Sequence, residues 1–236
     1  MLGVASEPMT LVSPVAIGEG TYALDHARLD RALYGSAKRL LDILIAATLL
    51  LALLPVFAVI GIAVCCDSGW PFFYRGERVG LFGRRFMVLK FRSMRAGADQ
   101  TPHVEFIRTL MHESAPRCEL YKVNNDPRVT RFGAFLRRTS LDELPQLWNV
   151  LRGDMSLVGP RPDVTYAVAD YSPDLQRRLL VKPGMTGLWQ VSGRSRLSLQ
   201  EMYRLDLDYV ASASLALDVR ILARTVPAVL RHEGAA

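Results

Sequence analysis

The chain has 236 residues, of which 50% are hydrophobic, and it carries a formal net charge of +6. This length is enough for one domain with a good core and an appendage. The basic balance predicts an anionic partner, either a phosphorylated molecule, nucleic acid or anionic lipid, and the mean hydropathy of +0.15 favours membrane contact. Three cysteines without CxxC spacing exclude an even disulfide framework, and four histidines without HExxH spacing argue against zinc.

The N-terminal segment mixes Gly, Pro and Ser without a sustained period, so we expect residues 1–35 to form a flexible lead. The hydrophobic segment over residues 40–64 is interrupted only by Asp42 and Thr48, and it is long enough to cross a bilayer. Asp42 lies near its start, where we expect the carboxylate at the level of the lipid headgroups, within reach of Lys38 or Arg39.

Both flanks of this segment are basic, since Lys38 and Arg39 precede it and four arginines follow within residues 75–85. Positive charge marks the cytoplasmic side, so both flanks are expected there. Pro55 removes a helical hydrogen bond and bends the axis. These features favour a re-entrant helical hairpin over residues 36–66, broken at Pro55, and an ordinary kinked transmembrane helix is the alternative.

The following residues predict two short strands over 72–75 and 85–91, with the turn at 80–83 between them. An amphipathic helix is expected around residues 104–111 and a turn at 124–127. Residues 129–138 form a basic helix or strand.

Beyond the motif described next, apolar residues at helical spacing over 144–151 predict a helix that ends at Gly153. The tail over 215–231 sets apolar residues against three arginines. It is either an amphipathic helix lying on the membrane surface or a packed C-terminal helix with a solvated face.

Two adjacent carboxylates, Asp142 and Glu143, follow a pair of arginines. Acids among cations suggest phosphate chemistry, in which cations neutralise phosphoryl oxygens while a carboxylate binds a metal or attacks phosphorus. The alternative is a capping box, in which Ser140 and Glu143 only cap a helix. Pro145 at the first helical position would leave both carboxylates just outside the helix, and we prefer this arrangement because a cap at Ser140 would strain the second turn.

Two acids repel an incoming anion unless cations outnumber them. Arg161 lies between two prolines, which limits its backbone freedom and suits a fixed guanidinium fork on a phosphate, although a surface arginine in a rigid turn is the default for an isolated Pro-Arg-Pro. The cations available for such a site are Lys90, Arg92, Arg137, Arg138, Arg161 and Lys182.

The sequence resembles the bacterial sugar transferases, which are monotopic phosphoglycosyl transferases that start exopolysaccharide and O-antigen assembly. The resemblance runs from about Lys38 to Arg231 and looks like the short form of the family, a single catalytic module. Its motifs are Lys90-Phe91-Arg92-Ser93-Met94, Asn125-Asp126-Pro127-Arg128, the segment Arg137 to Gln146, the segment Gly153 to Pro162, and Lys182-Pro183-Gly184-Met185-Thr186-Gly187.

This resemblance implies transfer of a sugar 1-phosphate from a UDP-sugar to undecaprenyl phosphate, with release of UMP. It implies that Asp142 is the nucleophile, that Glu143 is its partner in handling a metal or proton, and that both hold Mg²⁺. The matching cations, Lys90, Arg137 and Arg161, together with Lys182, are expected to bind phosphate. The family's re-entrant helix, broken at a proline, agrees with Pro55.

We therefore expect a mainly helical α+β fold, with the re-entrant hairpin, interfacial amphipathic helices and a small β element around a cytosolic active site. Residues 67–236 would form a catalytic domain on the cytoplasmic face of the bacterial inner membrane, in contact with membrane lipid. The aromatic residues do not interleave with the basic ones, so nucleic acid is not expected. A non-catalytic membrane scaffold of polysaccharide assembly is the alternative function. The sequence does not determine which sugar is transferred, although the short-form resemblance favours galactose or glucose. It does not determine the oligomeric state either, and a homo-oligomer is one of the states it allows.

Overall fold

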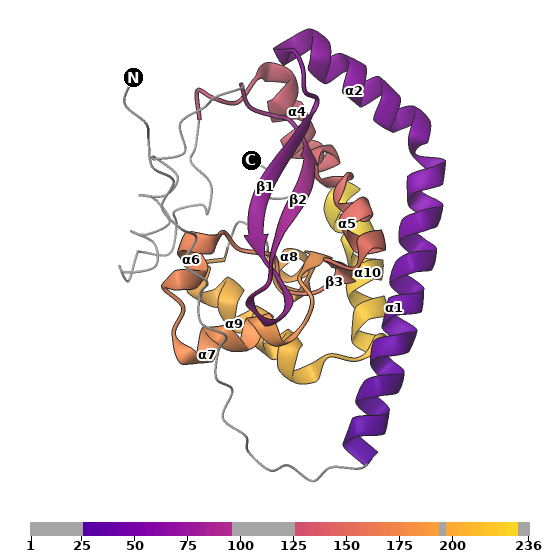
Figure 1. Cartoon of the computed structure of the whole chain (residues 1–236), viewed down its shortest axis with the longest axis vertical. Helices are drawn as coiled ribbons and strands as arrows, with labels where there is room; N and C mark the ends of the chain where they lie inside the picture. The colour runs from indigo at the N-terminus through magenta and orange to yellow at the C-terminus, as the bar shows by residue number, and fades with distance from the viewer. Residues whose placement is uncertain (1–25, 96–125, 194–196, 231–236) are drawn as a thin grey trace, which may run out of the picture.

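The computed structural model describes residues 26–95, 126–193 and 197–230, which form a mainly helical α+β fold (Figure 1). A long helix runs along one side, a second helix bends over the top, and a β-hairpin extends from there toward the remaining helices. The α-helices are α1 (His26–Ala52), α2 (Leu54–Ser68), α4 (Arg131–Thr139), α5 (Gln146–Arg152), α6 (Thr165–Ala169), α7 (Pro173–Gln176), α8 (Leu188–Ser192), α9 (Leu199–Ser212) and α10 (Leu215–Leu230). The short 3₁₀ turns are η1 (Leu81–Gly83), η2 (Leu141–Glu143) and η3 (Arg177–Leu180).

The two apolar helices meet at a bend of 62°, with Pro55 in the first turn of α2. Proline has no N–H to donate, yet Leu53 and Phe57 still donate backbone hydrogen bonds across the bend, each 2.9 Å long. The predicted break at Pro55 is therefore confirmed. Within the described part of the chain, no single helix is long and apolar enough to cross a membrane, but this bent pair meets both conditions. The helix starts at His26, so residues 26–35 of the expected lead are helical.

Asp42 lies inside the protein and not at the lipid headgroups, contrary to our expectation. Its side chain is 3% exposed, and it accepts hydrogen bonds from the Ser156 hydroxyl at 3.1 Å and the Leu157 backbone N–H at 2.9 Å. A buried carboxylate requires such donors, which the start of β3 (Ser156–Val158) supplies. This contact fixes α1 to the domain.

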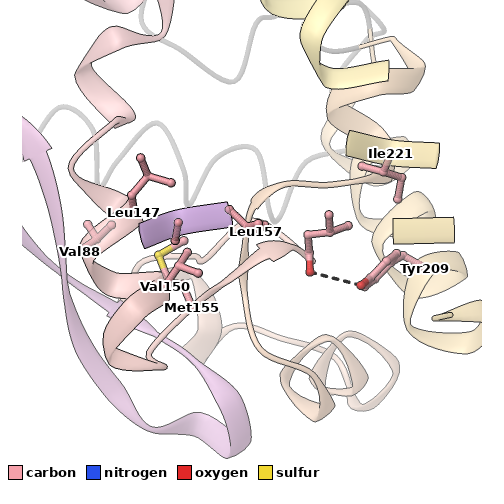
Figure 2. Close-up of a cluster of buried hydrophobic side chains, with 9 residues drawn as sticks. Val88, Leu147, Val150, Met155, Leu157, Tyr209 and Ile221 are labelled. Carbon is pink, nitrogen blue, oxygen red and sulfur yellow. Dashed lines mark hydrogen bonds between the residues drawn. The ribbon is translucent and has the colours of Figure 1, made fainter. Parts of the chain in front are cut away.

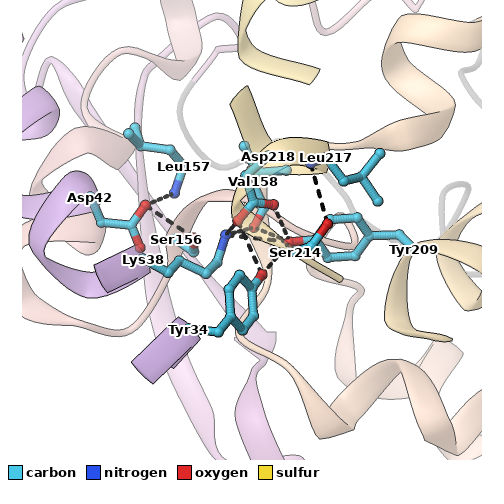
Figure 3. A network of polar contacts seen from close by, with 10 residues as sticks. All are labelled: Tyr34, Lys38, Asp42, Ser156, Leu157, Val158, Tyr209, Ser214, Leu217 and Asp218. Carbon is cyan, nitrogen blue, oxygen red and sulfur yellow. Dashed lines mark hydrogen bonds and ion pairs between the residues drawn. The ribbon is translucent and has the colours of Figure 1, made fainter. Parts of the chain in front are cut away.

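The cations Lys38 and Arg39 also bind the domain. The Lys38 ammonium donates to the Val158 carbonyl oxygen at 3.0 Å and to the Asp218 carboxylate at 2.8 Å (Figure 3). Arg39 donates at 2.6 and 2.7 Å to the carbonyl oxygens of Val150 and Leu151, in the last turn of α5. Both side chains therefore hold α1 against the domain. The positive-charge argument from the sequence assigned them only to the cytoplasmic flank of the membrane segment.

The predicted hairpin is confirmed as β1 (Phe73–Val79) and β2 (Arg85–Phe91), joined through η1. The strands are antiparallel, with Phe73 opposite Phe91 and Val79 opposite Arg85. A second, parallel pair joins β3 to β4 (Gly184–Thr186). These two small sheets are the β element of the fold.

The main hydrophobic core lies where α1, α5, β2, β3, α9 and α10 meet (Figure 2). Each large apolar side chain buried there contributes about 1.5–3 kcal/mol to folding. Its buried residues are Ala46, Val88, Leu147, Val150, Met155, Leu157, Val158, Tyr209 and Ile221. A second cluster, Ile60, Val64, Phe91 and Leu136, packs α2 against β2 and α4. The two clusters meet the hairpin at Val88 and Phe91, so they fix the end of β2.

The remaining sequence predictions mostly hold. Most of the segment 129–138 is helical, as part of α4, and α5 ends at Gly153, whose φ of 89° is left-handed and suits glycine. Helix α10 buries Asp218 and Ile221 and packs on α1 and α8, in agreement with the packed alternative. The helix expected at 104–111 and the first two residues of the turn expected at 124–127 lie outside the described residues, while Pro127 and Arg128 form a turn.

Candidate active site

The two adjacent carboxylates lie on the turn η2, between α4 and α5. Helix α4 ends at Ser140, whose left-handed φ of 58° redirects the chain. The Ser140 side chain caps no helix, and its carbonyl oxygen accepts from the Glu143 N–H at 3.2 Å. Pro145 is the N-cap of α5, one position earlier than predicted. The capping-box alternative is therefore wrong, and both acids lie just before α5, as we expected.

Glu143 is clamped by two cations from different elements. The Lys90 ammonium, on β2, lies 2.7 Å from Glu143 Oε1. The Arg161 guanidinium lies 2.6 Å from Oε1 through Nη2 and 3.2 Å from Oε2 through Nη1. Burial raises the pKa of Glu143, but Arg161 and Lys90 outweigh it and hold the pKa well below its usual value. Glu143 is thus an ionised, fixed carboxylate.

Asp142 differs from its neighbour although the two are adjacent. Its side chain is 7% exposed, and within the described ranges its carboxylate has no hydrogen-bond partner. Burial raises the pKa of Asp142, Glu143 raises it further, and Lys90 and Arg137 oppose the shift. Two acids whose environments move their pKa values apart are suited to separate roles. Asp142 is the one with free oxygens.

Arg137, at the end of α4, lies near both acids. Its Nε donates to the Ser93 hydroxyl at 2.9 Å, and its other guanidinium nitrogens make no hydrogen bond to any described residue. Burial lowers the pKa of Arg137, while the charge of Asp142 raises it. These free nitrogens are donors that can bind a phosphate oxygen. We did not single out Ser93 from the sequence, although it lies in the Lys90-to-Met94 motif.

Other cations named from the sequence lie elsewhere. Arg92 is 7% exposed and donates to the carbonyl oxygens of Ser68 and Gly69, so it fixes the end of α2. Lys182 is not brought to the acid pair, because the charges that shift its pKa are Arg39, Asp42 and Asp154, on the α1 side of the domain. Arg138 is exposed on α4.

Asn149 is a fully buried residue that holds the site together. Its Oδ1 accepts from the Leu89 N–H at 2.9 Å, and its Nδ2 donates to the Met87 carbonyl oxygen at 2.8 Å. This side chain links α5, which follows the acid pair, to β2, which carries Lys90. The signal in the sequence was a polar residue between core positions of a predicted helix, and we did not use it.

The donor chemistry of the acid pair fits Mg²⁺. This ion prefers oxygen ligands and is held by one or two carboxylates together with substrate phosphates. Asp142 has free oxygens, whereas those of Glu143 are engaged by Lys90 and Arg161. Among the described residues, no group of three or more His, Cys, Asp or Glu side chains is suitably placed for a metal. Substrate phosphate oxygens and water would supply the other ligands of a Mg²⁺ ion held by Asp142.

Comparison with known proteins identifies the family. The model of the bacterial sugar transferases matches residues 33–232. A UDP-galactose-lipid carrier transferase from Erwinia amylovora is 46% identical over 84% of this chain and 41% of its own length. An undecaprenyl-phosphate galactose phosphotransferase from Salmonella typhimurium is 42% identical over 84% of this chain and 41% of its own. The exopolysaccharide production protein ExoY of Rhizobium meliloti is 41% identical over 94% of this chain and 95% of its own. The chain spans about two fifths of the first two relatives and nearly all of the third, and it belongs to the bacterial sugar transferase family.

Proposed function

We propose that this chain transfers a sugar 1-phosphate from a UDP-sugar to undecaprenyl phosphate and releases UMP, as a first step of surface glycan assembly. The names of the relatives support the reaction class, because they include transferases from UDP-galactose and phosphotransferases to undecaprenyl phosphate. The observation that carries the proposal is the contrast at η2. A buried Asp142, whose oxygens have no hydrogen-bond partner among the described residues, lies beside a Glu143 fixed by two cations.

The proposed reaction has two displacements at one phosphorus atom. An Asp142 oxygen attacks the sugar-bearing phosphorus, the bond from that phosphorus to the bridging oxygen breaks, and UMP leaves. The product is an acyl phosphate that joins the sugar phosphate to Asp142. An oxygen of undecaprenyl phosphate then attacks the same phosphorus and displaces the carboxylate. Splitting the transfer lets one phosphate pocket serve a soluble donor and a lipid acceptor in turn.

The cations prepare this pocket for an anionic substrate. Two guanidinium nitrogens of Arg137 bind no other described residue and can meet a phosphoryl oxygen, and Lys90 and Arg161 lower the negative charge around Glu143. Lys90 and Arg161 can each bind a phosphate oxygen as well, because each has N–H donors to share between Glu143 and the substrate. Asp142 would hold Mg²⁺, and the ion would supply further neutralisation of the phosphoryl oxygens.

The bent helix pair is proposed to hold the site at the membrane. Apolar side chains are exposed along both helices, among them Leu44, Leu51, Val59 and Ile62, which are 56%, 70%, 67% and 66% exposed. Large exposed apolar surfaces mark sites of membrane or protein contact. The pair would dip into the cytoplasmic leaflet and return, which places the site at the level of the acceptor headgroup on the inner membrane.

The test measures UMP release from a panel of UDP-sugars, with and without undecaprenyl phosphate. With donor alone, the wild type should release about one UMP per site and stall, as expected for a covalent intermediate. The trapped protein should carry the sugar-phosphate mass on the peptide containing Asp142. Asp142→Asn should abolish both signals, and Glu143→Gln should slow turnover without moving the label. A first UMP that strictly requires the lipid, with no labelled peptide, would contradict the covalent route. No UMP under any condition would support the scaffold alternative.

A further inference from the structure

A buried cluster behind Arg161 contains an arginine that is fully engaged within the protein. Arg178, on η3, is 5% exposed. Its Nε and Nη2 donate to Asp206 Oδ2 at 3.1 and 2.7 Å, and its Nη1 donates to Asp163 Oδ2 at 2.7 Å. Nη1 also donates to the Tyr171 hydroxyl. The two carboxylates come from α9 and from the loop after β3, so this guanidinium joins three separate segments.

The remaining donor of Arg178 leads to the candidate active site. Its Nη2 donates to the backbone carbonyl oxygen of Arg161 at 3.0 Å. A guanidinium has five N–H donors, and these contacts use all of them. Arg178 therefore has no donor left for a substrate, and its contact with the residues that bind Glu143 is the one to Arg161.

The position of the Arg161 backbone matters because of what its side chain does. The Arg161 guanidinium meets both oxygens of Glu143, and such a two-pronged contact depends on where the fork starts. The flanking residues Pro160 and Pro162 restrict the backbone torsion angles around Arg161. The hydrogen bond from Arg178 to the Arg161 carbonyl oxygen restricts the position of this backbone. Asp163 is also fixed to the hairpin, since its carbonyl oxygen accepts from the Val79 N–H at 3.0 Å.

We propose that Arg178 is a positioning residue for the transfer reaction, which holds Arg161 so that its guanidinium keeps Glu143 in place. This inference rests on the proposed function. An error of about 1 Å in the position of a catalytic group can lower a rate about 100-fold, so a modest shift of Arg161 is enough to matter.

The test replaces Arg178 by Lys, which keeps the charge but cannot hold two carboxylates and a carbonyl oxygen at once. We expect kcat per folded enzyme to fall about tenfold or more, with the KM for the UDP-sugar changed less than about threefold. The matched control is Arg177→Lys at the adjacent, exposed position, which should keep kcat. Asp206→Asn, which keeps the shape of the carboxylate and one oxygen, is a milder variant in case Arg178→Lys folds poorly. This variant is compared with the wild type at about pH 8.5, where Asp206 of the wild type is ionised. Burial raises the pKa of Asp206 to about 7, although Arg178 opposes the shift.

A double-mutant cycle separates positioning from a general loss of structure. If Arg178 acts through Arg161, adding Arg178→Lys to Arg161→Lys should lower kcat little further than Arg161→Lys alone. If the two single losses in kcat multiply in the double variant, the positioning role is overturned and the proposed function stands. The same holds if kcat per folded enzyme stays near wild type in both Arg178→Lys and Asp206→Asn. A wild type that releases no UMP from any UDP-sugar would overturn the proposed function and this inference with it.

Discussion

Lys38 of α1 and Asp218 of α10 form an ion pair of 2.8 Å between residues 180 positions apart in the sequence (Figure 3). The Asp218 carboxylate is 1% exposed and also accepts hydrogen bonds from the hydroxyls of Tyr34, at 3.0 Å, and Tyr209, at 2.7 Å. The first helix is thus joined to the last one by a buried carboxylate. This contact connects the proposed membrane helix to the domain that carries the active site.

Removing the cation of this pair should destabilise the fold. Lys38→Met leaves the Asp218 charge buried without its cation, which costs about 3–5 kcal/mol. We expect a lower midpoint of thermal unfolding in detergent. Arg220→Ala, on the exposed side of α10, is the control and should change the midpoint little. Adding Asp218→Asn to Lys38→Met should recover part of the loss. If Lys38→Met and Arg220→Ala unfold at the same temperature, the pair contributes no stability.

Substitution of either cation that binds Glu143 should slow the reaction. Arg161→Lys keeps the charge but loses the two-pronged contact, so UMP release should fall by about 10-fold to 100-fold. Lys90→Ala should lower the rate by a similar factor, because Glu143 loses one of its two cations. Membrane association should stay intact in both variants. The control is Arg152→Ala, an arginine whose side chain is 60% exposed. Near-normal rates in both variants would show that the phosphate site lies elsewhere.

The first step should depend on pH through Asp142. The nucleophile must be ionised, and burial raises the pKa of this carboxyl, so the first UMP release should decline on acidification at a higher pH than an ordinary aspartate would give. Lys90 lowers this pKa, and Glu143 keeps Arg161 as a partner when Lys90 is removed. Lys90→Ala should therefore move the decline to a still higher pH.

The measurement is the burst of UMP as a function of pH, at matched amounts of folded enzyme. Lys182→Ala serves as the control, because that lysine lies near Arg39 and Asp154 and should leave the pH of the decline unchanged. A decline that moves to lower pH in Lys90→Ala would contradict the proposed ionisation of Asp142.

The bent pair predicts that both of its ends lie on the cytoplasmic face. Single cysteines at Ser36 and Arg75, both exposed positions, in a background without native cysteines, should be shielded from an impermeant periplasmic reagent. Pro55→Ala restores a helical N–H and should straighten the pair toward a spanning helix. In that variant one cysteine should become reactive. Labelling of only one position in the unsubstituted pair would indicate a spanning helix.

Sequence alone determined the features that depend on neighbouring residues. The break at Pro55 follows from a missing N–H, the hairpin from alternation around a glycine turn, and the end of α5 from Gly153. The acid pair before α5 could also be located, because Pro145 restricts where a helix can begin. All of these are local properties, and the structure changes their boundaries by only a few residues.

Only the tertiary structure decided which charged side chains meet. Lys90, Arg161 and Lys182 are equivalent as cations in the sequence, yet packing of α5 against β2 brings the first to Glu143 and leaves the last near α1. Asp42 and Arg92 were read as membrane-level and site charges, and both are buried, where they bind groups distant in the chain. Charge acts at distances of a few ångströms, so its partners are set by three-dimensional packing and not by spacing along the chain.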